Sequence, residues 1–263
     1  MRFSGKVALV TGGSKGIGMA AARLFAQEGA SVAIVSHENG DAVADELGAG
    51  AGHKRVIAVQ ADVSKHQQVQ AAVRQTAEAF GGIDILVNSA GVQRYGDVVE
   101  TDEAVWDEVI DVNLKGMFLT SKHCIPEMRK RGGGAIVNVS SVQAYASQTG
   151  VAAYSASKGG INALTRAMAV DHAAENIRVN AVCPASIDTP MLRWAADLFK
   201  GQSTQEEIIQ SWGRMHPIGR VGTTEEVAEL VAYLCSDKAG FITGADIKVD
   251  GGMFATFGVK LPD

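Results

Sequence analysis

The sequence predicts an α/β protein in which helices cover both faces of a seven-stranded parallel sheet. Short runs rich in β-branched residues alternate with longer amphipathic stretches along the whole chain. Most of these runs are apolar throughout, which is typical of strands buried on both faces. Strands that alternate with helices are joined by right-handed crossovers, and the result is a doubly wound sheet. No repeat or linker divides the 263 residues, so we expect residues 1–263 to form a single domain.

Seven runs are expected to be strands. In chain order they are Val7–Thr11, Ser31–Ser36, Val56–Gln60, Ile85–Asn88, Ala135–Ser140, Arg178–Val182 and Asp246–Val249. Two of the helical stretches between them begin with capping boxes, at Ser64–Gln67 and at Thr223–Glu226. In doubly wound sheets, ligands bind beyond the carboxyl ends of the strands, where the strand order reverses. We therefore expect the functional site at that edge of the sheet.

The stretch of about 188–215 interrupts the alternation. Met191, Trp194, Ala195 and Leu198 recur at helical spacing, and a second capping signal lies at Ser203–Glu206 after a glycine. Two short helices on an excursion from the sheet suit a cover for the substrate pocket. A packed peripheral insert is the alternative.

Composition and charge exclude several classes of function. A net charge of −5 and a pI near 5.7 do not suit a protein that binds nucleic acid, because phosphate binding needs clustered Lys and Arg. The one basic cluster, Arg129–Arg131, is expected to end a helix. We expect a soluble cytoplasmic protein, since no leader and no apolar stretch near the ~20 residues of a membrane span stand out. Cys124, Cys183 and Cys235 lack metal-ligand spacing, so we expect reduced core thiols and no metal site.

A glycine-rich turn, Thr11-Gly12-Gly13-Ser14-Lys15-Gly16-Ile17-Gly18, follows the first strand and opens a helix. Glycines let the backbone approach an anion closely, and a helix N-terminus supplies N–H groups and a positive dipole. The glycine spacing differs from the common G-x-G-x-x-G pattern. Because the turn directly follows an apolar strand, we expect a dinucleotide phosphate site there rather than only a tight corner. Its residues would be Gly12, Ser14, Lys15, Gly16, Ile17 and Gly18.

The end of the second strand favours NADP over NAD. An acidic residue at this position would pair with the ribose hydroxyl of NAD and repel the 2′-phosphate of NADP. The position holds Ser36, followed by His37, and the nearby Lys15 ammonium is placed to reach a 2′-phosphate. Glu38 favours the opposite choice, so NADP is the preferred cofactor and NAD the alternative.

Tyr154 and Lys158 are four residues apart and share one face of a predicted helix. A free phenol has a pKa of ~10, and lowering it to ~7 needs about 4 kcal/mol of preference for the phenolate. One cation at ~4 Å contributes about that much at an effective dielectric constant of ~20. Lys158 would supply part of this and an oxidised nicotinamide more, so the pair predicts an acid–base device near neutrality.

With its surroundings, this pair resembles the short-chain dehydrogenase/reductase family, in the compact branch of about this length. The resemblance spans nearly the whole chain and rests on TGGSKGIG at 11–18, Asp62-Val63, Asn88-Ser89-Ala90-Gly91, Asn113, Ser140-Ser141, Tyr154-x-x-x-Lys158 and Pro184…Thr189. It implies a Rossmann-like fold and an NAD(P)-dependent oxidoreductase that acts on CH–OH groups. The motifs are specific for fold and reaction class and much less so for substrate.

The resemblance also implies residue roles. The family's serine precedes its tyrosine by 13 residues, so Ser141 would hydrogen-bond the substrate oxygen. Tyr154 would exchange a proton with that oxygen, Lys158 would hold the nicotinamide ribose, and Asn113 would anchor a water that relays protons. The other implied cofactor contacts are Asp62 and Val63 at the adenine, Asn88, Ala90 and Gly91 at its ribose, and Pro184, Ile187 and Thr189 at the nicotinamide end. Ser89 and Ala185 stand where the family commonly has Asn and Gly, and neither removes a group from this mechanism.

Gly159 and Gly160 follow Lys158 inside a predicted helix, where each costs up to ~1 kcal/mol relative to alanine. Their small size allows another backbone to approach closely. In the family that this chain resembles, the corresponding helix packs against a symmetry mate. We therefore expect a homodimer or a homotetramer.

The expected substrate residues are Gln93, Gln143, Tyr145, Gln148 and Trp194. Three amides suit a hydroxyl-rich ligand, and the set is similar to that of family members that oxidise sugars, so an aldose or polyol is the preferred substrate. Trp194 with Leu198 and Phe199 would suit an apolar ketone or steroid instead. Arg129–Arg131 would suit the acidic carrier protein of a 3-oxoacyl-carrier-protein reductase.

Two further hypotheses lie outside this reaction. A dinucleotide-binding redox sensor without turnover would lack the tyrosine or the lysine, and both are present. An epimerase would need a larger C-terminal substrate domain, whereas eleven residues follow Asp250-Gly251-Gly252.

Overall fold

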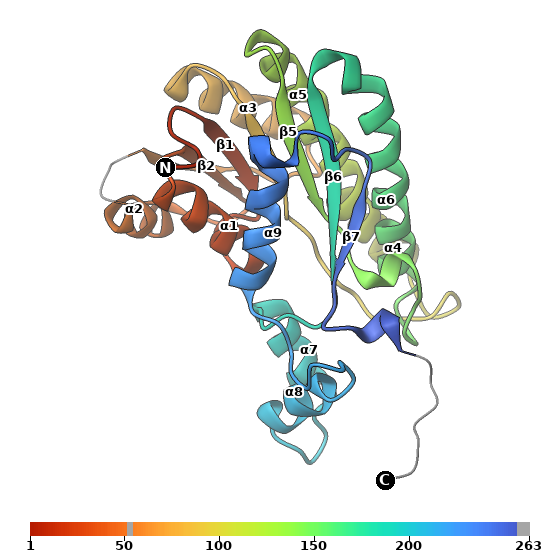
Figure 1. The fold of residues 1–263 in the computed structure, drawn as a ribbon. Coiled ribbons are helices and arrows are strands. Elements are labelled where there is room, and N and C mark those ends of the chain that lie inside the picture. The colour runs from red at the N-terminus through yellow and green to blue at the C-terminus, as the bar shows by residue number, and fades with distance from the viewer. Residues whose placement is uncertain (52–54, 257–263) are drawn as a thin grey trace.

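The computed structural model describes residues 1–51 and 55–256, and a seven-stranded parallel sheet forms its centre (Figure 1). The strand order is β3-β2-β1-β4-β5-β6-β7, so the order reverses between β1 and β4. The strands are β1 Val7–Thr11, β2 Ser31–Ser36, β3 Val56–Gln60, β4 Ile85–Asn88, β5 Gly134–Val139, β6 Ile177–Pro184 and β7 Asp246–Val249. The predicted α/β, Rossmann-like, doubly wound fold is confirmed.

Helices form a layer on each face of the sheet (Figure 1). One layer holds α1 Gly16–Gln27, α2 Asp41–Gly50 and α9 Thr224–Cys235. The other holds α3 His66–Phe80, α4 Glu103–Ile110, α5 Gly116–Lys130 and α6 Ala152–His172. Alternate side chains of each strand enter different layers, as Ala8 and Val10 pack with α1 and α9 while Leu9 packs with α3 and α5. This explains why the inner strands are apolar throughout.

The predicted helix starts are correct in one case and displaced in two. Thr223 and Glu226 form the expected capping box of α9. Ser64 does not cap α3, because its hydroxyl donates to the Asp62 carboxylate at 2.7 Å and the helix begins at His66. The second capping signal acts one residue later than predicted, with Thr204 as the cap.

Two strands also differ at their ends from the prediction. β5 runs from Gly134 to Val139 and so excludes Ser140, and β6 extends to Ile177 and Pro184. Pairing of the two strands along their length explains the extension, since Gly134 lies opposite Ile177.

The stretch of about 188–215 forms two short helices, α7 Pro190–Phe199 and α8 Gln205–Gly213, as expected. They project beyond the carboxyl end of the sheet (Figure 1). Thr189 caps the start of α7, where its hydroxyl accepts from the Leu192 amide at 3.2 Å. Gly201 follows the end of α7 and has a φ of 55°, a conformation common just after a helix. Residues of both helices line the cleft described below, which agrees with a covering role.

Other local predictions also have outcomes. Arg129 and Lys130 lie in the last turn of α5, as expected, and each pairs with a glutamate. The three cysteines are buried and free.

A Cβ on Gly160 would lie 2.7 Å from Leu114 of the same chain, so a contact within the subunit already explains this glycine. Within residues 1–51 and 55–256, no helix has the length and apolar character of a membrane span.

Candidate active site

A cleft of about 1170 Å³ opens at the carboxyl ends of β1, β4, β5 and β6. Ligand pockets commonly measure roughly 300–1,000 Å³, so this cleft has room for a dinucleotide together with a small substrate. The predicted cofactor residues that line it are Gly12, Ser14, Lys15, Gly16, Ile17, Ser36, His37, Asp62, Val63, Ala90, Gly91, Tyr154, Lys158, Pro184, Ile187 and Thr189. Gly18 and Asn88 do not line the cleft. Gly18 packs against the Gly12 carbonyl, and the Asn88 side chain is hydrogen-bonded in the interior.

The glycine turn has the shape of a cradle for an anion. Gly12 and Gly16 have φ angles of 64° and 55°, which side-chain-bearing residues rarely adopt. A Cβ on Gly12 would lie 2.9 Å from the Ala90 amide nitrogen, and one on Gly18 would lie 2.3 Å from the Gly12 carbonyl oxygen. The turn therefore closes tightly on α1, and the Lys15 side chain at the N-cap leaves the first helical amides uncapped. These features fit the pyrophosphate of a dinucleotide.

The end of β2 carries an ion pair rather than a free lysine. The Lys15 ammonium lies 2.6 Å from the Glu38 carboxylate, and His37 lies 3.6 Å from the same group. The Lys15 hydrogen bond lowers the pKa of Glu38. The Ser36 hydroxyl donates to the Glu38 carbonyl at 2.6 Å, which holds this loop in place. A ligand phosphate that binds Lys15 must therefore compete with Glu38.

Asn88 belongs to a buried polar network, which explains its absence from the cleft. Its amide donates to Asn138 at 2.9 Å and its oxygen accepts from Thr120 at 2.6 Å. Asn138 in turn donates to Thr165 of α6 at 2.9 Å. The Asn88 side chain thereby connects β4 and β5 to α5 and α6, and the predicted position of Asn88 at the ribose stays a prediction.

Thr11 is a residue of this region that motif comparison did not select for a role. Its hydroxyl accepts hydrogen bonds from the Ser89 and Ala90 amides at 3.1 and 3.2 Å. It thereby fixes the turn after β4 against the glycine turn after β1. A threonine at a strand end has no distinctive sequence signal for this task.

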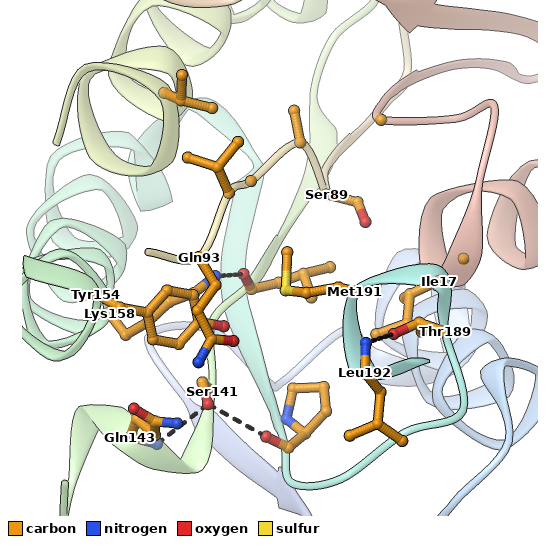
Figure 2. A pocket seen from close by; sticks show the side chains of 18 of the residues that line it. Ile17, Ser89, Gln93, Ser141, Gln143, Tyr154, Lys158, Thr189, Met191 and Leu192 are labelled. Atoms are coloured by element: carbon orange, nitrogen blue, oxygen red, sulfur yellow. Dashed lines mark hydrogen bonds between the residues drawn. The ribbon is translucent and has the colours of Figure 1, made fainter. Parts of the chain in front are cut away.

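Tyr154 lies in the first turn of α6 and Lys158 one turn further along the same face. The Lys158 ammonium is 5.2 Å from the centre of the Tyr154 ring and donates to the Val139 carbonyl at 2.9 Å. Both side chains are buried among the protein's own atoms yet line the cleft. Figure 2 shows Tyr154 beside Gln93 and Ser141, with Ile17 and Thr189 across the cleft.

Burial controls the ionisation of this pair in the cofactor-free protein. It raises the pKa of Tyr154 to about 12, and the Ser141 hydroxyl offsets this only in part. It also lowers the pKa of Lys158 to about 8. The acid–base pair predicted near neutrality relied on an oxidised nicotinamide as well as on Lys158, and without that charge burial keeps Tyr154 a neutral phenol.

Ser141 stands at the end of β5, on the same wall as Tyr154. Its hydroxyl accepts from the Gln143 amide at 3.1 Å and donates to the Pro184 carbonyl over a long 3.5 Å (Figure 2). The long donor contact is easily exchanged for a substrate oxygen. Ser140 also lines the cleft, but its hydroxyl already donates to the Lys158 carbonyl at 3.2 Å. The choice of Ser141 over Ser140 is thus consistent with the geometry.

Asn113 lies outside the cleft, in a π-helical segment, Asp111–Lys115, between α4 and α5. Its side chain accepts from the Val92 amide at 2.8 Å and donates to the Val92 carbonyl and to Ser157. The amide group is fully engaged, so its observed effect is to hold the 91–96 loop against α6. The predicted role in binding a relay water stays a prediction.

Three of the predicted substrate residues line the cleft, namely Gln93, Gln143 and Gln148, and two do not. The Tyr145 hydroxyl donates to the Asp246 carbonyl at 3.1 Å, and its ring lies under Lys248. Trp194 is 45% exposed and stacks on Tyr95 instead of facing the cleft. Direct substrate contacts of Tyr145 and Trp194 stay predictions, and these two positions do not favour them.

Met191, Leu192, Phe199, Trp212 and Met215 belong to the stretch of about 188–215 that was predicted to cover the pocket. Met253 and Phe254 come from a segment that no motif marks. They follow β7, and the preceding Asp250 and Gly251 are hydrogen-bonded to the 216–218 loop. Periodicity identifies an apolar position but does not say which distant segment it will face.

The arrangement is suited to proton exchange beside a bound dinucleotide. A substrate oxygen between Ser141 and Tyr154 meets one hydroxyl that can donate and one that can give or take a proton. Lys158 and the burial of the site determine the pKa of Tyr154, and so how readily it gives or takes that proton. Among residues 1–51 and 55–256, no cluster of three or more His, Cys, Asp or Glu side chains is arranged to hold a metal ion.

Comparison with known proteins places these features in context. A sequence profile of the family described as enoyl-(acyl carrier protein) reductase matches residues 12–254. The chain is 40% identical over 255 residues to a 3-oxoacyl-[acyl-carrier-protein] reductase of Thermotoga maritima, covering 96% of this chain and 99% of that protein. It is 40% identical over 261 residues to a meso-2,3-butanediol dehydrogenase of Serratia marcescens, covering 98% of each. A ligand-free aldohexose dehydrogenase structure from Thermoplasma acidophilum superposes with a TM-score of 0.91 at 38% identity, covering 99% of this chain and 98% of that one.

Proposed function

The chain belongs to the short-chain dehydrogenase/reductase family, oxidoreductases that act on CH–OH groups with NAD or NADP, and we propose that its substrate is an aldose or a polyol. The observation that carries the reaction is the placement of Ser141, Tyr154 and Lys158 on one wall of the cleft. The three amide side chains beside them support a hydroxyl-rich substrate.

Each of the three residues has a distinct task in the proposed mechanism. A bound nicotinamide cofactor would supply the hydride acceptor or donor, and the residues that would hold it are those of the glycine turn and Lys158. Ser141 holds the substrate oxygen, and Tyr154 takes its proton during oxidation or returns it during reduction. Lys158 positions the nicotinamide ribose and, when charged, stabilises the phenolate. Met191, Leu192 and Phe199 of α7 limit the access of water to this end of the cleft.

The polar rim of the cleft supports the choice of substrate. Ser155 donates to Gln143 at 3.4 Å and shares a 2.8 Å hydrogen bond with Ser147. With Gln93 and Gln148, these groups offer both donors and acceptors to sugar hydroxyls. Two similar proteins, an aldohexose dehydrogenase and a butanediol dehydrogenase, are named for substrates that carry several hydroxyl groups.

Reduction of a 3-oxoacyl thioester is the second candidate, favoured by the 40% identity to the reductase of that name. The basic cluster that would meet an acidic carrier protein is already paired within the chain. Arg129 contacts Glu175 at 2.7 Å, Lys130 contacts Glu127 at 2.8 Å and Arg131 contacts Asp84 at 3.1 Å. A carrier protein would have to compete with these carboxylates, so we rank this function second.

Turnover assays test the substrate class. Reduced-nicotinamide absorbance should rise with aldoses or polyols, and Tyr154→Phe should lower kcat by at least about 100-fold, the usual share of an acid–base group. Undiminished hydride transfer in this variant would refute the mechanism. If the protein turned over only acetoacetyl thioesters, the proposed aldose or polyol substrate would be wrong, and the proposed mechanism would still hold.

We further propose that NADP is preferred over NAD, on the support of Lys15 and His37 beside an end of β2 that carries Ser36. The Lys15–Glu38 pair opposes this preference in part. Isothermal titration with 2′,5′-ADP and 5′-AMP measures the phosphate contribution without turnover. Tighter binding of 2′,5′-ADP, and a further gain in Glu38→Gln, are expected. Equal binding of both nucleotides would contradict the preference.

A homodimer or homotetramer is also proposed. Trp106 of α4 and Phe118 of α5 are 40% and 46% exposed, which supports a partner surface there. Light scattering after gel filtration measures the mass directly, and a monomer at micromolar concentration would contradict the proposal.

A further inference from the structure

We propose that Tyr95 is a substrate-binding residue whose hydroxyl hydrogen-bonds a substrate oxygen other than the one that reacts. The inference rests on the proposed function and makes it more specific. The substrate class that it selects carries a second hydroxyl besides the one that reacts, and a neighbouring hydroxyl is the one tested below.

The loop that carries Tyr95 is anchored on both sides. Asn113 holds Val92 through two hydrogen bonds, at 2.8 and 2.9 Å. On the other side, Gly96 pairs with Val151, and its amide donates to the Gly150 carbonyl at 2.8 Å. Tyr95 therefore stands on a backbone that is fixed to the start of α6.

The same anchoring brings Tyr95 towards the reacting centre. Val151 immediately precedes α6, and Tyr154 lies in the first turn of that helix. Tyr95 and Tyr154 both line the cleft. Tyr95 is close enough to Tyr154 to contribute to the raised pKa of that phenol, so a substrate held between Ser141 and Tyr154 can reach it.

Two aromatic side chains of α7 fix the ring of Tyr95. Trp194 stacks on it with ring centres 5.8 Å apart, and Phe199 meets it edge-on at 4.6 Å. Offset stacking and edge-to-face contacts are the favoured geometries of aromatic pairs. Since the ring is held on two sides, the direction of its hydroxyl is set before substrate binds. The outward-facing Trp194 thus acts on the site through Tyr95.

Tyr95 is half-buried, and the Gln148 side chain is a polar neighbour of its hydroxyl. Burial raises the pKa of Tyr95, and the nearby Gln148 side chain offsets this in part, so the group is a protonated donor at neutral pH. Gln148 also lines the cleft and carries both a donor and an acceptor. The two side chains together can satisfy both functions of one substrate hydroxyl.

Tyr95→Phe tests the hydroxyl while it keeps the ring and its contacts with α7. Two probe pairs each differ by the neighbouring hydroxyl, namely D-glucose with 2-deoxy-D-glucose and meso-2,3-butanediol with 2-butanol. In the variant, the ratio of kcat/KM within a pair should fall roughly five- to tenfold, the effect of one lost neutral hydrogen bond, mainly through KM. The deoxygenated member should keep its value.

Tyr233→Phe is the matched control, because Tyr233 lies on α9, outside the residues that line the cleft. It should leave every value unchanged. An unchanged ratio in Tyr95→Phe, or an equal loss for both members of a pair, would overturn the role of the hydroxyl while leaving the proposed function standing. If the wild-type protein oxidises no member of either pair, the substrate class and this inference fall together.

Discussion

Binding of the oxidised cofactor should lower the pKa of Tyr154 by about two units, because a positive charge near ~5 Å stabilises the phenolate by about 3 kcal/mol at an effective dielectric constant of ~20. The starting point is the buried phenol of the cofactor-free protein, with a pKa of about 12 against a usual 10.0. Burial thus disfavours the phenolate by about 2.7 kcal/mol.

The lysine determines how much further the pKa can fall. Lys158 has a pKa of about 8 and its ammonium lies 5.2 Å from the phenol ring centre. A forming phenolate favours the charged lysine, so the two groups ionise as a coupled pair. When Lys158 is charged it adds to the effect of the cofactor, so the pKa of Tyr154 in the complex should fall below the value that the cofactor alone would give.

Carbon-13 NMR of protein labelled at the tyrosine ζ carbons measures this directly. The chain has four tyrosines, and Tyr154→Phe identifies the resonance in question. Without cofactor, the Tyr154 signal should not titrate below pH ~10.5, and with saturating oxidised NADP its midpoint should fall to ~10 or lower. Lys158→Met should raise the midpoint of the complex again.

Two results would refute the reasoning. A Tyr154 signal that titrates near neutrality without cofactor would mean that burial does not control the phenol. An identical midpoint with and without saturating cofactor would mean that the bound positive charge does not reach it.

Three further perturbations have expected outcomes. Gly18→Ala places a Cβ 2.3 Å from the Gly12 carbonyl oxygen and should weaken 5′-AMP binding, measured by calorimetry, at least tenfold. Gly159→Ala is the control and should leave this binding unchanged, because its Cβ would meet nothing within 4 Å. Asp84→Ala removes a buried carboxylate that accepts from a β1 amide at 2.9 Å and pairs with an arginine, so urea unfolding should show a loss of about 2–3 kcal/mol; a loss below 0.5 kcal/mol would contradict this. Lys158 has a folded pKa of about 8 against 10.5, so its burial costs stability below pH 8 and the cost is recovered as the pH rises to 10.5. Lys158→Met should therefore gain stability over wild type at pH 7 and lose that advantage by pH 10.5, and an advantage independent of pH would contradict the shift.

Much of the site was predictable because its backbone elements are encoded locally. The glycine turn, the strand ends and the four-residue spacing of Tyr154 and Lys158 each depend on neighbours in the chain. Once the sheet is parallel, the carboxyl ends of its strands must meet at one edge. Most of the predicted cofactor residues line the cleft for this reason.

What the sequence could not supply was the choice of side-chain partner. Asn88 was expected at a ribose, and its side chain is hydrogen-bonded to Thr120 and Asn138. Tyr145 was expected at the substrate, and its hydroxyl donates to the Asp246 carbonyl. A polar residue at a strand end can face the cleft or the interior, and only the packed neighbours decide which.

By itself, the sequence determined the α/β fold, the phosphate turn and the chemistry of the Tyr154–Lys158 pair, because hydrophobic period, glycine placement and helical spacing are properties of short segments. Only the tertiary structure decided that Lys15 meets Glu38, that Trp194 acts on Tyr95 rather than in the cleft, and that burial keeps the phenol protonated before a cofactor binds. These outcomes depend on which distant groups share a small volume from which water is excluded, and no local pattern specifies that volume.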